Sequence, residues 1–132
     1  MKPRVAFFDF ACCEGCQLSI VNLEEKIIDL VSVVDVVEFR EAISDQSDKY
    51  DIAFIEGSIT RSQDEERIKK IRSIAKVLIA FGSCATTGGV NSLKNNFSFD
   101  EVKKFVYGEN SEMPHLNTSK TKSVDEVVTV DY

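Results

Sequence analysis

The sequence has no long apolar run and no basic patch. None of its apolar stretches approaches the roughly 20 residues that a membrane-spanning helix requires, so we expect no direct membrane span. The formal net charge of −6 disfavours general binding to nucleic acid or to an anionic membrane surface. What remains is the class of soluble globular proteins, for which an apolar fraction of 43% and a charged fraction of 29% are ordinary.

A secretory signal is absent and histidine is nearly so. Only a few apolar residues lie between Met1 and Asp9, which is unlike a signal peptide. The single histidine is His115. The sequence therefore predicts a cytoplasmic, reducing location, in which the four cysteines serve metal or redox chemistry rather than disulfides.

Short apolar runs alternate with helical patterns along a chain of single-domain length, residues 1–132. Strands are expected at residues 5–10, 33–39, 51–55, 77–81 and 127–132. A first helix is expected from about residue 16, with an apolar stripe of Ile20, Leu23, Ile27 and Leu30. A second helix is expected from Ser62, which opens a capping-box pattern. A third is expected at 100–107, before Gly108. Loops are expected at 41–51 and 107–123. This alternation predicts an α/β protein with a flavodoxin-like doubly wound parallel sheet.

All four cysteines follow expected strands. Cys12, Cys13 and Cys16 come directly after the first strand, and Cys84 comes directly after the fourth. The loops beyond the carboxyl ends of the strands are where open α/β sheets bind their ligands. Thiols on two such loops therefore predict a metal centre.

Cys13 and Cys16 form a C-x-x-C pair in which Gly15 permits a sharp turn. Such a pair suits an iron–sulfur cluster or structural zinc, and zinc would need Cys12 or His115 as a further ligand. The pair also fits a thiol–disulfide redox protein. Of the two metal centres, the thiolates fit a [4Fe–4S] cluster better.

Cys84 lies in the glycine-rich segment 82–89. A nucleophilic role would require a base, for which only the distant His115 is available, and a glycine where Thr86 stands. A phosphate or flavin cradle would require a G-x-G-x-x-G spacing that the segment lacks. We interpret Gly88 and Gly89 as positions where the backbone passes close to a cluster or a partner chain. A flavodoxin-like binding or assembly module without a cluster is a further alternative.

Two motifs carry a resemblance to a known family. They are Cys13-Glu14-Gly15-Cys16-Gln17-Leu18-Ser19 and Gly82-Ser83-Cys84-Ala85-Thr86-Thr87-Gly88-Gly89, together with Tyr50-Asp51-Ile52-Ala53-Phe54-Ile55-Glu56-Gly57-Ser58. With them the chain resembles the small, electron-transferring subunit of [NiFe] hydrogenases and the 20-kDa subunit of respiratory complex I. It looks most like the delta subunit of archaeal sulfhydrogenases and the small subunit of F420-non-reducing hydrogenase.

The resemblance implies a flavodoxin-like domain that holds the proximal [4Fe–4S] cluster and relays electrons. It implies Cys13, Cys16 and Cys84 as ligands. The family's fourth ligand lies in a Gly-Cys-Pro motif, which this sequence does not reach. The implied partners are a large [NiFe]-hydrogenase-type subunit and other electron-transfer subunits, with the cysteine-bearing loops at the interface. Close backbone approach to the cluster is expected at Gly15, Gly82, Ser83 and Gly88, and the backbone amides at the Cys16 turn are expected to point toward it.

Overall fold

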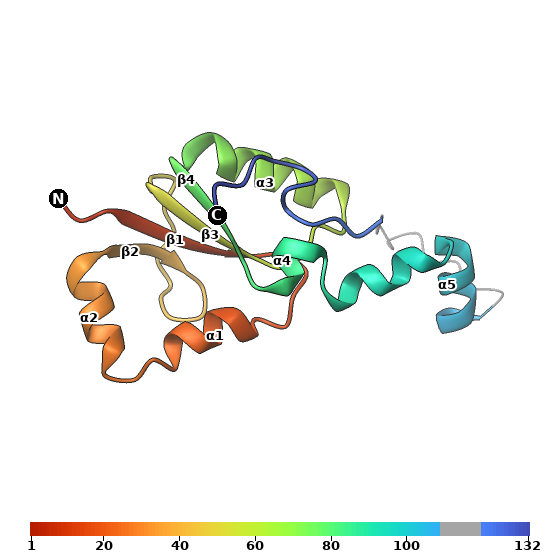
Figure 1. Cartoon of the computed structure of the whole chain (residues 1–132), viewed down its shortest axis with the longest axis horizontal. Coiled ribbons are helices and arrows are strands. Elements are labelled where there is room, and N and C mark those ends of the chain that lie inside the picture. The colour runs from red at the N-terminus through yellow and green to blue at the C-terminus, as the bar shows by residue number, and fades with distance from the viewer. Residues whose placement is uncertain (109–119) are drawn as a thin grey trace.

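The computed structural model describes residues 1–108 and 120–132 (Figure 1). Ten elements are described in it. In chain order they are β1 (Arg4–Asp9), α1 (Gly15–Val21), α2 (Lys26–Val33), β2 (Asp35–Phe39), β3 (Ile52–Glu56), α3 (Ser62–Ile74), β4 (Val77–Phe81), α4 (Ser83–Thr87), the 3-10 helix η1 (Val90–Asn96) and α5 (Phe99–Tyr107).

The four strands form one parallel sheet in the order β2-β1-β3-β4. Strand β1 lies between its two neighbours, with Phe7 opposite Phe39 of β2 and Phe54 of β3. This order matches the flavodoxin-like arrangement, in which the chain winds outward in both directions from the first strand. The predicted fold class is therefore confirmed.

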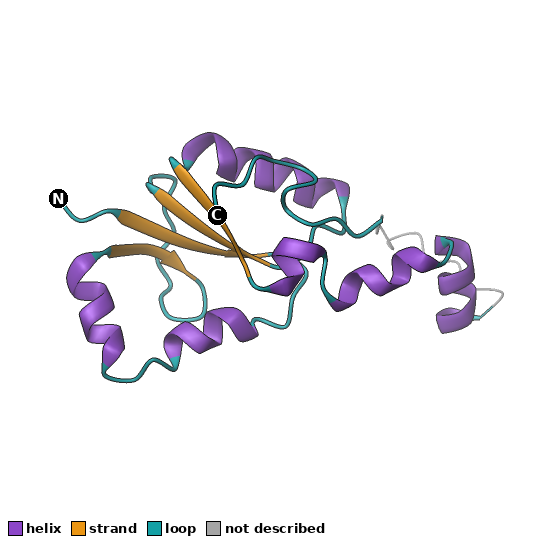
Figure 2. Cartoon of the chain, viewed as in Figure 1, coloured by secondary structure: helices purple, strands orange, loops and turns teal. Residues whose placement is uncertain are grey.

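The two faces of the sheet carry different helices (Figure 2). On one face Phe7 packs with Phe39, and Ile20 and Val21 of α1 pack against this group. On the other face the core includes residues such as Ile68 of α3. The alternation of neighbouring β1 side chains between the two faces is the two-residue period of a strand. The sheet is thus a buried layer, and packing on both of its faces fixes the positions of the carboxyl ends of its strands.

The 3-10 helix η1 and α5 lie away from the sheet, at one end of the molecule (Figure 1). We call these two elements, residues 90–107, the arm. Helix α5 begins with a capping box between Ser98 and Glu101 and is followed by Gly108, as the sequence predicts for its end. No residue of η1 or α5 is buried.

Three sequence-based predictions about the elements are wrong. The helix expected from residue 16 is two helices, because Glu24 takes a left-handed φ of 52° in the turn between them. Ser62 begins α3 but does not cap it; the N-cap is Arg61, whose side chain pairs with Asp64.

The third wrong prediction is the strand at 127–132. The backbone of Val124 accepts hydrogen bonds from the amides of Val127 and Val128, which makes a turn there. Only Asp131 and Tyr132 reach the edge of β4, through two backbone hydrogen bonds, and two residues are too few for a strand. Of the loop expected at 107–123, residues 109–119, including His115, lie outside the described residues.

The other predicted strands and the helix at 100–107 agree with the structure to within two residues at their starts, and β4 agrees at both ends. The sequence analysis did not predict α4 or η1. The connection from β2 to β3 has no helix or strand, as expected for 41–51. No helix in the described ranges is long and apolar enough to cross a membrane.

Candidate metal centre at the carboxyl edge of the sheet

The cysteines lie where the chain leaves β1 and β4. Cys12 and Cys13 are in the loop after β1, Cys16 is in the first turn of α1, and Cys84 is in α4, directly after β4. All four are free thiols, with Cys13 exposed and the others partly buried. Because the strands are parallel, their carboxyl ends meet at one edge of the sheet, and this brings segments distant in sequence together.

Cys16 interacts with both of the other predicted ligands. Burial is the main cause that raises the pKa of the Cys16 thiol, followed by the charge of Glu56 and a hydrogen bond to it. The charges of Cys13 and Cys84 raise this pKa further. The other two thiols are therefore within electrostatic range of the Cys16 sulfur. We call Cys13, Cys16 and Cys84 the cysteine trio.

Cys12 lies in a different environment. Burial raises the pKa of its thiol to about 11, and the charges of Glu56, Asp9 and Glu14 add to this effect, against a lowering hydrogen bond from the backbone of Glu14. The charges that act on Cys12 are those of carboxylates, so this thiol is held in its neutral form.

Each sulfur of the cysteine trio lies against a glycine. A Cβ atom added to Gly15 would lie 3.3 Å from Cys13 Sγ, one added to Gly82 would lie 2.3 Å from Cys16 Sγ, and one added to Gly89 would lie 2.8 Å from Cys84 Sγ. Gly82 and Gly89 also have positive φ values, of 83° and 55°. At these positions a side chain would collide with the sulfur of a cysteine, so the backbone forms a cradle around the trio.

Two residues predicted for the site, Gly88 and Ser83, are not part of that cradle. A Cβ on Gly88 would meet Cβ of Ser92 in η1 at 2.9 Å, so Gly88 makes room for η1, and its neighbour Gly89 is the glycine beside Cys84. Ser83 is exposed in the first turn of α4, and its carbonyl accepts a hydrogen bond from the hydroxyl of Thr87.

The sequence analysis missed Glu56, the last residue of β3. Its side chain is only 2% exposed. One carboxylate oxygen accepts the backbone N–H of Cys16 at 3.1 Å, and the other accepts the N–H of Gln17 at 3.0 Å. The amides that were expected to point toward a cluster therefore donate to Glu56. The available signal was an acidic residue that directly continues a buried apolar strand.

Further polar residues hold the loop that carries the cysteines. Arg40 pairs with Asp9 at 3.1 Å and also with Glu14, the residue before Gly15. From η1, the side-chain amide of Asn91 donates to the carbonyl of Ala11 at 2.8 Å and to the hydroxyl of Ser58 at 3.0 Å. The arm is thus attached to the cysteine loop by specific hydrogen bonds.

The donor set fits a cluster better than a single ion. Within residues 1–108 and 120–132, no three histidine, cysteine or carboxylate side chains lie close enough together to hold one metal ion. This geometry does not support structural zinc among the described residues. In an iron–sulfur cluster the thiolates bind different iron atoms and therefore lie farther apart than the ligands of a single ion.

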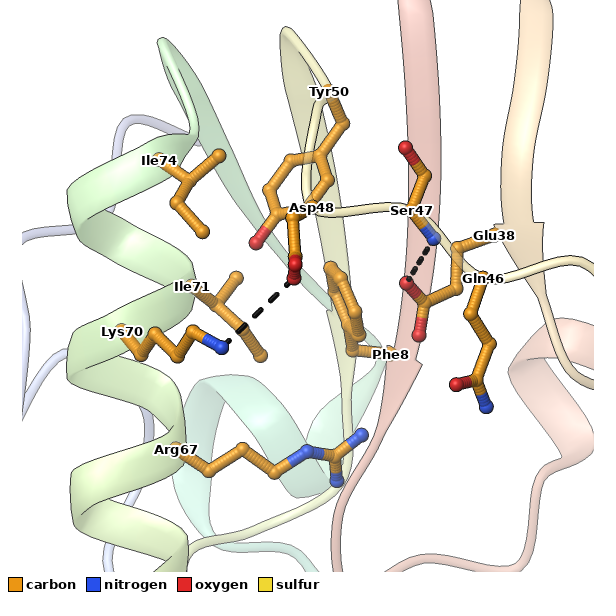
Figure 3. A pocket seen from close by; sticks show the side chains of 10 residues that line it. All are labelled: Phe8, Glu38, Gln46, Ser47, Asp48, Tyr50, Arg67, Lys70, Ile71 and Ile74. Carbon is orange, nitrogen blue, oxygen red and sulfur yellow. Dashed lines mark hydrogen bonds and ion pairs between the residues drawn. The ribbon is translucent and has the colours of Figure 1, made fainter.

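A separate hollow of about 260 Å³ lies between α3 and the loop before β3 (Figure 3). Its lining includes Phe8, Tyr50 and Ile71, together with the charged residues Glu38 and Arg67. Burial raises the pKa of Tyr50 to about 12. None of the lining residues is a cysteine, so the hollow is distinct from the cradle.

Comparisons with known proteins point to one family. The model of the family described as NADH ubiquinone oxidoreductase, 20 Kd subunit, matches residues 13–132. The chain is 32% identical to a subunit of the F420-non-reducing hydrogenase vhu of Methanococcus voltae, over 99% of this chain and 50% of that protein. It is also 32% identical to sulfhydrogenase 2 subunit delta of Pyrococcus furiosus, over 98% of this chain and 53% of that protein.

The chain therefore spans about half the length of these curated relatives. Among solved structures, a chain of an NAD+-reducing [NiFe]-hydrogenase in the H2-reduced state superposes with a TM-score of 0.86. The match covers 100% of this chain and 80% of that one, at 24% identity. This likeness supports the fold.

Proposed function

The chain belongs to the family of the 20 Kd subunit of NADH ubiquinone oxidoreductase, and on that premise we propose that it is the electron-transfer subunit of a [NiFe]-hydrogenase-type complex and carries the proximal [4Fe–4S] cluster. The observation that carries this proposal is the cradle. Three cysteines from two strand ends are gathered at one edge of the sheet, and each sulfur lies against a glycine.

In this proposal Cys13, Cys16 and Cys84 are ligands of the cluster. The cluster supplies the uptake and release of single electrons. The protein holds the three thiolates in place through the strands that precede them and keeps the backbone close through Gly15 and Gly82. No residue of the chain makes or breaks a substrate bond in this role. A reducing, cytoplasmic location keeps the thiols available.

A partner subunit is proposed to cover the cysteine edge and the arm. Exposed Cys13 needs a second surface to exclude water from a cluster. The arm, which Asn91 attaches to the cysteine loop, exposes Val90, Leu93, Phe97 and Phe105. Contiguous exposed apolar side chains of this kind mark interaction sites in soluble proteins. The large hydrogenase-type subunit is the partner that the family implies, along with further electron-transfer subunits.

The thiol–disulfide alternative uses only Cys13 and Cys16. It gives no role to Cys84, although the sulfur of Cys84 also lies against a glycine of the cradle. A cluster uses all three thiols, and metal binding itself displaces the thiol protons.

The proposal is tested by anaerobic reconstitution of the full chain, in the presence of a small thiol that can serve as a further ligand. Iron and sulfide are measured and paramagnetic resonance spectra are recorded. We expect about four irons per chain. The Cys84→Ser variant should lose them, and Cys12→Ser, which changes the thiol outside the trio, should retain them.

The same measurement can contradict the proposal. Absence of iron from the wild-type chain would favour a cluster-free binding or assembly module. Equal iron content in the wild-type and Cys84→Ser proteins would exclude Cys84 as a ligand.

A further inference from the structure

Glu56 closes both ends of the cysteine loop. Its backbone carbonyl accepts the N–H of Phe10 at 2.8 Å, where the chain leaves β1. Its carboxylate accepts the N–H groups of Cys16 and Gln17, where the chain enters α1. Residues 10–17, which carry three of the four cysteines, are therefore held between hydrogen bonds to a single residue of the central sheet.

The carboxylate of Glu56 is held without a cation. It is 2% exposed, and in the part of the chain that the structure describes no lysine or arginine forms an ion pair with it. Burying a carboxylate is costly unless hydrogen bonds compensate the charge. Hydrogen bonds from N–H groups to an ionised carboxylate are among the strong ones in proteins. Glu56 and the first turn of α1 therefore depend on each other.

We infer that Glu56 is a positioning residue of the metal centre: it fixes Cys16 against Gly82 and places a fixed negative charge beside the Cys16 sulfur. Two observations support this. The carboxylate of Glu56 accepts the backbone N–H of Cys16 at 3.1 Å, and Gly82 lies directly against the Cys16 sulfur. The side-chain amide of Gln17, 1% exposed, has no hydrogen-bond partner within the described residues, so this side chain offers no substitute for the backbone bond to Glu56.

The charge has a consequence for electron transfer, which rests on the proposed function. A cluster becomes more negative when it is reduced, and a fixed negative charge nearby opposes that change. Glu56 also takes up two N–H groups that could otherwise donate to sulfur and favour the reduced form. Both effects lower the reduction potential of a cluster held by Cys16.

Amide hydrogen exchange in the iron-free chain tests the positioning. In the Glu56→Ala variant the amides of Cys16 and Gln17 should exchange at least tenfold faster, while that of Ile68 in α3 stays unchanged and reports that the sheet is folded. Glu56→Gln, which keeps one acceptor oxygen, should have a smaller effect and serves if the alanine variant does not fold. Unchanged exchange at both amides in a folded variant would overturn the inference.

The reduction potential of the loaded chain tests the charge. Glu56→Gln should favour the reduced form at least tenfold, equivalent to about 59 mV for one electron. Glu66→Gln, which removes the same charge from an exposed position of α3, should leave the potential unchanged. An unchanged potential in Glu56→Gln would overturn the charge effect while the proposed function stands. If the wild-type chain binds no iron, the proposed function fails, and amide exchange still decides the positioning role.

Discussion

Apolar side chains are buried in the body of the molecule and exposed in its arm. In the body, which comprises the sheet and α3, side chains such as Ile55 and Leu78 are fully buried. In the arm, Phe105 is 92% exposed and Phe97 is 65% exposed. The body therefore obtains its burial from its own chain. The arm keeps its helix through local capping, and its apolar surface requires another molecule for burial.

The largest expected difference between the two regions is in the free energy of unfolding, when one large apolar side chain is truncated in each. Ile55→Ala removes fully buried atoms from β3 and should lower the free energy of unfolding by about 2–5 kcal/mol. Phe105→Ala should change it by no more than about 0.5 kcal/mol, because the side chain is exposed. Urea denaturation measures both. Similar losses in the two variants would contradict the distinction between body and arm.

A second comparison uses two glycines with nearly the same backbone conformation. Gly82 in the body has φ 83° and ψ 169°, and Gly108 at the end of the arm has φ 85° and ψ 177°. Replacement of either by alanine should cost about 1–3 kcal/mol of local strain, since this region of φ and ψ is open essentially to glycine alone. At Gly108 no atom of the described residues lies within 4 Å of the added Cβ.

At Gly82 the added Cβ would lie 2.3 Å from Cys16 Sγ, so overpacking should add about 1–3 kcal/mol. Iron uptake should fall in Gly82→Ala and persist in Gly108→Ala. Denaturation and iron analysis on both variants check this expectation. Normal iron content in Gly82→Ala would exclude Gly82 from the cradle.

A smaller effect is expected from a charge placed on the arm. Phe105→Glu should leave the free energy of unfolding within about 0.5 kcal/mol of the wild type, because the side chain is exposed. It should reduce the fluorescence of bound anilinonaphthalene sulfonate roughly twofold, because it interrupts the exposed apolar surface. Ile28→Glu on α2, outside the arm and at a residue 66% exposed, is the matched control and should have little effect on the dye. Equal losses of dye binding would show that the arm is not the dominant apolar surface.

The smallest effect concerns two carboxyl groups. The N–H of Leu78 and the side chain of Arg72 lower the pKa of Asp131 in the body, and bonds with Ser98 lower that of Glu101 in the arm. A lowered pKa in the folded state gives stability that is present above the ordinary carboxyl range and is lost as pH falls through the folded pKa. Asp131→Asn should therefore lower the melting temperature slightly near pH 7 and not in acid.

The counterpart in the arm should act locally. Glu101→Gln should reduce the helicity of α5, measured by circular dichroism, and leave the melting temperature of the body unchanged. A pH-independent difference between Asp131→Asn and the wild type would contradict the assigned role of the Asp131 charge.

The sequence predicts the four strands of the sheet better than it predicts the helix breaks and turns between and after them. Apolar runs locate β1, β2, β3 and β4, because buried parallel strands are nearly continuous in apolar residues. The break at Glu24 and the loss of the strand at 127–132 were not predictable from periodicity, since both depend on the local turn geometry of the folded chain.

For the site, the chain order of strands and cysteines was enough to place Cys13, Cys16 and Cys84 on loops that leave one edge of the sheet. The strand pattern did not reveal the role of Glu56, because its only signal was an acidic residue that continues a buried apolar strand. A glutamate at the end of a strand usually faces solvent, and only the tertiary structure shows that its carboxylate is buried against the start of α1. For Gly89 the sequence predicts a close backbone approach to a cluster or a partner chain, and the structure adds that its neighbour is the Cys84 sulfur, at the turn between α4 and η1.

The parallel register of the sheet sets the order in which the protein matures. Val5 of β1 pairs with Ile52, and Ile52 pairs with Val77, so every strand contact that joins the two cysteine segments closes a long loop. Such distant pairings form late and slowly in folding. Until they form, only the local pair Cys13 and Cys16 is close together in a nascent chain, and Cys84 joins them when β4 docks on β3. Under the proposed function, a site with all three thiols therefore exists only after the sheet has closed.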